Sequence, residues 1–176
     1  MTTTAAFSLA VCVRQSADVS HVHRLLRSAR PIVQQLIMVD ARIKQDMLIH
    51  HACSSVGVQL TALRISSMHD THECVRRVLD FAQDQSFAPY IMLLPPHARL
   101  LRPDNWERPV DASAYTVQIK TVRGELHRKP WILKKSVAWL WSSHVHMMGI
   151  LRPDSPIDEH PLIQRIPSLA IASVSV

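Results

Sequence analysis

The chain has 176 residues, of which 47% are hydrophobic and 19% are charged, so it is long and apolar enough for one domain with its own core. Its formal net charge of +6 suits a nucleotide, a nucleic acid or an acidic protein surface as partner. The sequence contains only three glycines, too few for a glycine-rich phosphate loop, and no apolar run reaches the ~18 residues that a membrane span needs.

The first part of the chain alternates short apolar runs with amphipathic segments. Residues 7–13 (FSLAVCV) form a continuous apolar run, which is typical of a strand buried on both faces of a sheet. The spacing of apolar residues predicts a helix over residues 19–30. A second buried strand is predicted over residues 35–40 (QLIMVD), and it ends on the carboxylate of Asp40.

The same alternation continues up to a pair of prolines. Two more helices and two more strands are predicted, with the order helix, strand, helix, strand, over residues 43–54, 56–65, 72–85 and 90–94. Strands and helices in strict alternation predict an α/β fold with a mostly parallel, doubly wound sheet. Ligands of such sheets bind outside the carboxyl ends of the strands. The residues to inspect are therefore those that follow each strand: Arg14, Asp40 and residues 95–99.

The second half of the chain has a different pattern. Alternating polar and apolar residues favour antiparallel strands over residues 114–122, 126–133 and 144–151. The last segment is rich in proline and ends in an apolar run, which is typical of an arm or edge strand. We therefore predict an α/β domain over residues 1–152, with a small antiparallel part, and a C-terminal arm over residues 153–176. An arm of this kind suits a protein partner or self-association through an added strand.

Three cysteines, Cys12, Cys53 and Cys74, lie far apart in the sequence, and none belongs to a CxxC pair. An odd number of cysteines without a secretion signal is typical of reduced thiols. We therefore expect a cytoplasmic protein with three free cysteines. Cys12 lies inside a predicted buried strand, where a thiol is usually inert.

The order of the segments resembles family 2 glycosyltransferases of the GT-A fold. The stretches that carry the resemblance span residues 8–147 in the family's order, and they are SLAVCVRQ, RPIVQQLIMVDA, RRVLDFAQDQSFAPYIMLLPPHARLL and RKPWILKKSVAWLWSSHVHM. The resemblance implies a nucleotide-diphospho-sugar transferase-like domain. It also implies that a UDP-sugar or another nucleotide is the ligand.

The resemblance further implies a divalent metal, for which this chain lacks the usual ligands. The family's DxD motif follows the fourth strand, and its carboxylates hold the ion that neutralises the diphosphate. Pro95, Pro96 and His97 stand at that degenerate position, and none supplies a carboxylate. The family's His-Glu histidine corresponds to His146, but no glutamate follows it. We therefore expect no cofactor, and a Mn²⁺ site would need His97, His144 and His146 to meet in the fold.

Four residues are candidates for contact with a nucleotide-sugar. Asp40 matches the family's carboxylate at the uracil or ribose, although a strand-end residue that caps a helix fits the sequence equally. Arg77 lies near the family's helix arginine, and Arg14 and Arg99 adjoin the strand ends. Such cations can replace a metal electrostatically, whereas ordinary exposed arginines are the alternative. No residue is singled out as a catalytic base.

Three functions remain open from the sequence. The first is a degenerate glycosyltransferase-like domain, a pseudoenzyme that serves as a binding or assembly module. The second is an active, metal-independent glycosyltransferase that transfers a hexosyl group, and the third is a basic protein associated with nucleic acid. An active enzyme predicts that Asp40, Arg77, Arg99 and His146 meet in one open cleft. A module predicts that Pro95, Pro96 and their neighbours fill that space.

Overall fold

The computed structural model describes residues 7–44, 47–66, 70–101, 114–120, 123, 126–137, 139–142, 150–153 and 163–173. The helices are α1 (Ala17–Ala29), α2 (Leu48–Val56) and α3 (Thr71–Gln85). The strands are β1 (Phe7–Val13), β2 (Val33–Asp40), β3 (Gln59–Arg64), β4 (Tyr90–Leu93), β5 (Ala98–Leu101), β6 (Ala114–Lys120), β7 (Leu126–Lys134), β8 (Trp139–Ser142), β9 (Ile150–Pro153) and β10 (Ile163–Ser173).

One large sheet forms the centre of the molecule, with the strand order β3-β2-β1-β4-β7-β6-β10-β5 among the described residues. β1 pairs in parallel with β2 and β4, and β2 pairs in parallel with β3. Beyond β4 the sheet is mixed, because β7 is antiparallel to both of its neighbours while β10 is parallel to β6. The predicted fold class, a mostly parallel doubly wound α/β sheet with a smaller antiparallel part, is confirmed.

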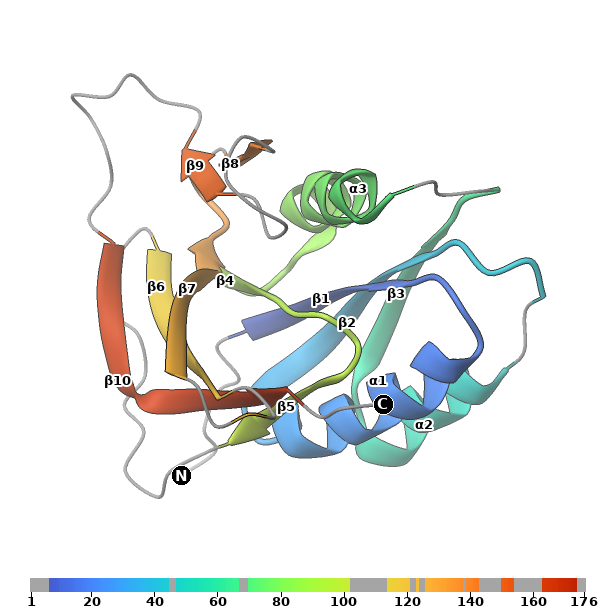
Figure 1. The fold of residues 1–176 in the computed structure, drawn as a ribbon. Helices are drawn as coiled ribbons and strands as arrows, with labels where there is room; N and C mark the ends of the chain where they lie inside the picture. The colour runs from blue at the N-terminus through green and yellow to red at the C-terminus, as the bar shows by residue number, and fades with distance from the viewer. Residues whose placement is uncertain are drawn as a thin grey trace.

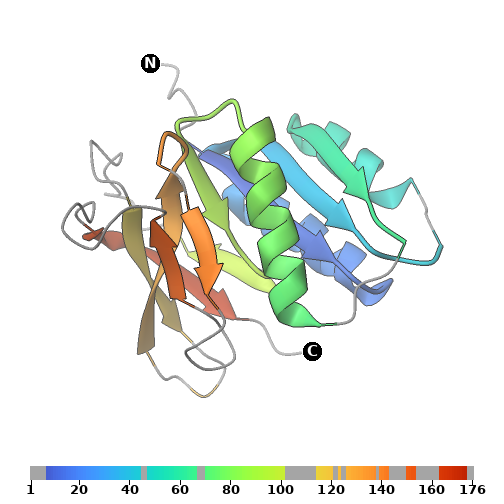
Figure 2. The ribbon, with the colours of Figure 1, turned by 90° about the horizontal axis from the view of Figure 1, so that it is seen from above.

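Helices cover both faces of the parallel half of the sheet. α1 and α2 lie on one face, while α3 and the small β8–β9 hairpin-like sheet lie on the other (Figures 1 and 2). In β1, Leu9 and Val11 pack with α1 and α2, whereas Ala10 and Cys12 pack with α3. Burial on both faces explains why the strands read as continuous apolar runs rather than as alternating ones.

Local sequence signals fix the helix ends. Asp70 caps α3, because its carboxylate accepts a hydrogen bond from the backbone N–H of Glu73 at 2.6 Å. α2 ends at Gly57, whose φ of 69° is the left-handed conformation that glycine adopts without strain. The sequence predicted that this helix would begin at Ile43, but it begins at Leu48, and the Ile43 side chain is exposed.

The C-terminal strand differs from its prediction. The expected arm or edge strand is wrong for residues 170–172, which pair with β6 on one side and with β5 on the other. The apolar C-terminal run therefore joins the sheet of its own chain, and residues 170–172 are not available to pair with a neighbouring chain. The structure also contains β5 and β8, which the sequence did not predict. The division of the chain at residue 153 stays a prediction.

The cysteines also differ from their prediction. Cys12, near the end of β1, forms a disulfide with Cys74 in the first turn of α3, with their Cα atoms 6.2 Å apart. Cys53 is free and buried in α2, and burial raises the pKa of its thiol to about 11. The expectation of three reduced thiols is thus wrong for Cys12 and Cys74, which meet because α3 packs on the Cys12 face of β1. The cytoplasmic prediction loses this support and stays untested.

Among the described residues, no helix has the length and apolar character required to cross a membrane.

Candidate functional site

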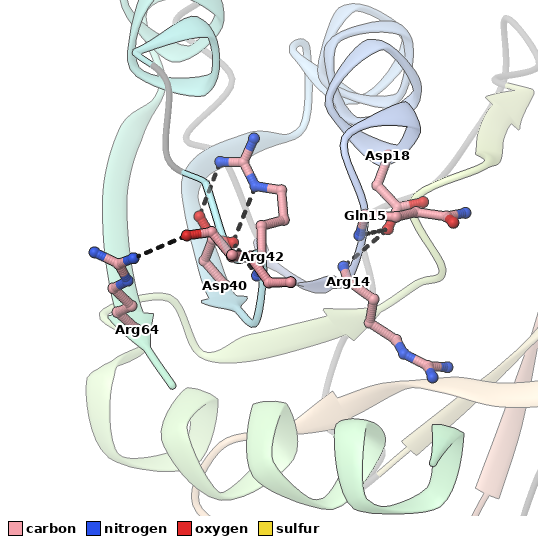
Figure 3. Close-up of polar contacts among 7 residues, drawn as sticks. Arg14, Gln15, Asp18, Asp40, Arg42 and Arg64 are labelled. Atoms are coloured by element: carbon pink, nitrogen blue, oxygen red, sulfur yellow. Dashed lines mark hydrogen bonds and ion pairs between the residues drawn. The ribbon is translucent and has the colours of Figure 1, made fainter. Parts of the chain in front are cut away.

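The carboxyl ends of the parallel strands bring an ion pair into the protein interior. Asp40 ends β2, and its side chain lies on the same face of the sheet as α2. The Arg42 guanidinium donates from Nε to Oδ1 at 3.0 Å and from Nη2 to Oδ2 at 2.8 Å, while the Arg42 backbone N–H donates to Oδ1 at 3.0 Å (Figure 3). Both side chains are almost fully buried, at 4% and 3% exposure. A buried carboxylate is tolerated only with partners of this kind.

The electrostatics of this pair favour the charged form of Asp40. Burial alone would raise the pKa of the carboxyl group. Hydrogen bonds from the Arg42 side chain and backbone, together with the charges of Arg42 and Arg64, outweigh that effect and hold the pKa of Asp40 below its ordinary value. Asp40 is therefore an ionised acceptor whose two oxygens already have donors within the chain.

A pocket of about 210 Å³ opens beside this ion pair, between the ends of β2 and β3 and the first turn of α2. We call it the α2 pocket. It is lined by Met38, Asp40, Arg42, Met47, Ile49, His50, Ala62 and Arg64. Arg64 is the last residue of β3, and one of its terminal nitrogens donates to the backbone carbonyl of Ile43 at 3.4 Å.

Arg14 lies at the same edge of the sheet as Asp40. It follows Val13, which is the register partner of Asp40 across the β1–β2 ladder. The carboxylate of Asp18 accepts hydrogen bonds from the backbone N–H groups of Arg14 at 2.9 Å and Gln15 at 3.1 Å, which fixes the turn into α1. The Arg14 side chain is exposed and extends away from this turn (Figure 3).

The other two candidate arginines do not join this group. Arg77 lies on α3, on the opposite face of the sheet from the Asp40 side chain, and forms an ion pair with Glu73 at 3.7 Å. Arg99 is exposed on β5, next to Leu100, whose backbone N–H donates to the hydroxyl of Ser28 in the second half of α1 at 3.0 Å. The structure therefore brings Arg14 and Asp40 to one edge, but it does not bring Arg77 and Arg99 to them. Nucleotide contact by any of the four stays a prediction.

The position that the sequence resemblance assigns to the DxD motif forms a turn at the end of β4. Pro95 and Pro96 are half-buried, and the backbone N–H of Ala98 closes the turn by donating to the Pro95 carbonyl at 3.1 Å. His97 is exposed at this turn. Desolvation of the covered part of its ring, followed by repulsion from His21, lowers the pKa of His97, while Asp18 raises it in part. At neutral pH this position therefore carries neither a carboxylate nor a charged imidazole.

The pKa of His97 can be tested directly. NMR titration is expected to give His97 a pKa below its ordinary value of 6.5, and His21→Gln is expected to raise it because a like charge is removed. His51→Gln, on the exposed surface of α2, serves as a control that should leave the titration unchanged. A wild-type pKa above 6.5, or no response to His21→Gln, would contradict this assignment.

The side chains at this edge do not suit a hard divalent ion. Within the described residues, no three His, Cys, Asp or Glu side chains lie close enough together to hold a metal. Mg²⁺ prefers several oxygen ligands, and Mn²⁺ prefers carboxylate with imidazole, whereas the turn after β4 offers one imidazole. His144 and His146, the other histidines of the predicted Mn²⁺ site, lie outside the described residues.

Sequence reasoning missed two residues of this region, Arg42 and Arg64. The sequence position of each residue is the signal that could have identified it. Arg42 stands two residues after a strand-end aspartate, close enough to fold back onto it, and Arg64 ends the strand next to β2. Basic residues at the ends of neighbouring parallel strands meet at one edge of a sheet, as carboxylates do.

Two solved structures of GT-A-like glycosyltransferases share this fold. The structure of S. aureus TarS 1–349 in complex with UDP aligns with 68% of this chain and 37% of that chain, with a TM-score of 0.51 and 13% identity. GalNAc-T7 with UDP, GalNAc and Mn²⁺ aligns with 98% of this chain and 44% of that chain, with a TM-score of 0.54 and 8% identity. The chain spans less than half the length of either protein, and at such identities the likeness shows the fold alone.

Comparison of the sequence with protein-family models and with curated proteins gives no match.

Proposed function

We propose that this chain is a degenerate glycosyltransferase-like domain that acts as a non-catalytic binding or assembly module. The observation that carries the proposal is the turn after β4, where Pro95, Pro96 and His97 stand in place of metal-binding carboxylates. Transfer of a sugar from a nucleoside diphosphate requires neutralisation of the leaving diphosphate. In the described residues, this turn offers no carboxylate that could hold a metal for that purpose.

The state of Asp40 supports the same proposal. Both of its carboxylate oxygens accept hydrogen bonds from Arg42 in a nearly dry environment. A nucleotide that used Asp40 as its acceptor would have to displace a buried guanidinium. Such a displacement leaves a buried charge without its partner, which costs far more than an exposed ion pair does.

A metal-independent transferase is the second candidate. It is favoured by two arginines at the edge where ligands of α/β sheets bind: Arg14 follows β1 and Arg64 ends β3, the strands on either side of β2. It is disfavoured by the positions of the other two candidate arginines, since Arg77 lies on α3 and Arg99 lies on β5. No observation in the described residues favours the nucleic-acid alternative. The partner of the module is a further proposal, and its binding surface cannot be the paired edges of β10.

The proposal predicts the outcome of a turnover assay. Release of UDP from UDP-glucose and from UDP-N-acetylgalactosamine is measured with Mn²⁺, with Mg²⁺ and with EDTA. We expect the rate to equal that of heat-inactivated protein in every condition. Release that scales with protein concentration in EDTA and falls with Arg14→Gln or Arg64→Gln, but not with Arg76→Gln on α3, would favour the metal-independent enzyme instead. Release that requires Mn²⁺ would contradict both candidates.

A further inference from the structure

The α2 pocket combines apolar walls with a charged end. Its walls include Met38, Ile49 and Ala62, and its charged groups come from the Asp40–Arg42 pair and from Arg64. Its volume of about 210 Å³ is below the ~300–1,000 Å³ of pockets that enclose a whole drug-sized ligand. The pocket is therefore sized for one end of a ligand, with the rest of that ligand lying outside it.

The charges at this end favour an anion. Asp40 and Arg42 neutralise each other through two short hydrogen bonds. Arg64 leaves a net positive charge among the described lining residues. It is exposed, interacts with the Asp40 carboxylate (Figure 3), and donates a long hydrogen bond of 3.4 Å to the Ile43 carbonyl. Because a guanidinium carries five N–H donors, the exposed Arg64 side chain can contact Asp40 and still bind the carboxylate or phosphate of a ligand. α2 begins beside the pocket with no acidic residue in its first turn, which adds to the positive potential.

The entrance of the pocket is apolar. Three large hydrophobic side chains are exposed between the end of β2 and the first residue of α2: Ile43 at 89% exposure, Met47 at 61% and Leu48 at 58%. Met47 lines the pocket and the Ile43 carbonyl accepts the hydrogen bond from Arg64, so these two residues adjoin the charged end, and Leu48 follows Met47 in the chain. Exposed aliphatic side chains that cluster beside a pocket are typical of a surface that an apolar ligand covers.

We propose that the α2 pocket binds a small anionic amphiphile, with its carboxylate or phosphate head on Arg64 and its hydrocarbon tail over Ile43, Met47 and Leu48. The head contacts the exposed guanidinium of Arg64. The tail covers the exposed hydrophobic side chains and gains from leaving water. This ligand class goes beyond the proposed function, because it depends on Arg64 and the apolar entrance and not on the turn after β4 or on a sugar nucleotide.

Octyl phosphate, used below its micelle concentration, is the probe that tests this inference by isothermal titration calorimetry. Binding of octyl phosphate to the wild-type chain is expected. Inorganic phosphate carries only the anionic head and octanol lacks its charge, so each should bind at least about tenfold more weakly. Arg64→Gln is expected to weaken binding at least about tenfold, because it removes the charged donor. Arg76→Gln, an exposed arginine on α3, is the matched control and should leave binding unchanged.

A second pair of variants tests the apolar entrance. Ile43→Ser is expected to weaken octyl phosphate binding several-fold, whereas Phe87→Ser, which removes an exposed hydrophobic side chain elsewhere, should not. Both substitutions replace exposed side chains, so the fold should be kept. Equal affinity for octyl phosphate and octanol, or full affinity in Arg64→Gln, would overturn the inference. Tighter binding of UDP than of octyl phosphate at Arg64 would also overturn it, because the pocket would then belong to a nucleotide.

The same series of measurements distinguishes a lipid headgroup from a free amphiphile as the ligand. Arg64-dependent sedimentation with vesicles that contain phosphatidic acid, but not with pure phosphatidylcholine vesicles, would identify a lipid headgroup. Binding of octyl phosphate monomers without vesicle binding would identify a free amphiphile, and both results support the inference. Its failure is distinguishable from failure of the proposed function, since UDP release from a sugar nucleotide is measured without any amphiphile.

Discussion

Reduction of the Cys12–Cys74 disulfide is expected to lower the free energy of unfolding by about 4 kcal/mol. The bond joins β1 to the first turn of α3 across a sequence separation of 62 residues, so it closes a long loop in the unfolded chain. In the chain-entropy description, a cross-link over a long loop removes many unfolded conformations and thereby stabilises the folded state. An effect of this size is a large part of the ~5–15 kcal/mol that holds a typical domain folded.

Urea unfolding with and without a phosphine reductant measures this effect. Reduction should shift the midpoint to lower urea and increase the slope, because the reduced unfolded chain exposes more surface. Cys74→Ser should abolish the response to the reductant. Cys53→Ser is the matched control, since Cys53 is a free buried thiol, and this variant should keep the full response. Identical midpoints with and without reductant in the wild-type chain would contradict the disulfide.

Arg42→Met is expected to destabilise the fold by about 3–5 kcal/mol at pH 7. The substitution leaves the Asp40 carboxylate buried without the guanidinium that donates to both of its oxygens. A double variant, Asp40→Leu with Arg42→Met, removes both charges and should recover most of that loss, because no unpaired charge remains. Urea unfolding of the single and double variants makes the comparison. A double variant that is less stable than Arg42→Met would contradict this account.

The pH dependence of that loss provides an independent check. The folded-state pKa of Asp40 lies below its ordinary value of 3.8, so its contribution to stability is present above about pH 4 and is lost as the pH falls through the folded-state pKa. In Arg42→Met, burial without Arg42 should raise the pKa of Asp40, and protonation then relieves the buried charge. The difference in stability between wild type and variant should therefore narrow as the pH is lowered from 7 to about 3.5. A difference that is constant with pH would contradict the role given to Asp40.

The parallel half of the fold was predictable from the sequence because each strand and helix carries its own local signal. Buried strands such as β1 and β2 read as unbroken apolar runs, and the helices between them show the spacing of one apolar face. β10 could not be placed in this way. Its position between β5 and β6 depends on pairings with strands far away in the sequence, which no local pattern encodes.

The candidate site was predictable only in part, for a similar reason. The doubly wound order placed Asp40 and Arg14 at one edge of the sheet, and their strands indeed end side by side. The sequence did not reveal that Arg42 turns back onto Asp40. The direction of a side chain after a strand end depends on the space beside the neighbouring helix, and local sequence does not encode that space. Arg77 was grouped with Asp40 because it lies near the helix arginine of the family that the sequence resembles, whereas its position on α3 places it on the opposite face of the sheet from the Asp40 side chain.

The proposed non-catalytic role depends on the turn after β4, which offers a metal no carboxylate, and one measurement tests it most directly. Isothermal titration of the chain with UDP is compared in the presence of Mn²⁺ and in the presence of EDTA. We predict that Mn²⁺ leaves the result unchanged, since Pro95, Pro96 and His97 offer the ion no carboxylate. UDP binding that appears only with Mn²⁺, and that is lost in His97→Ala, would contradict the claim and would mean that a working metal site is assembled at this turn.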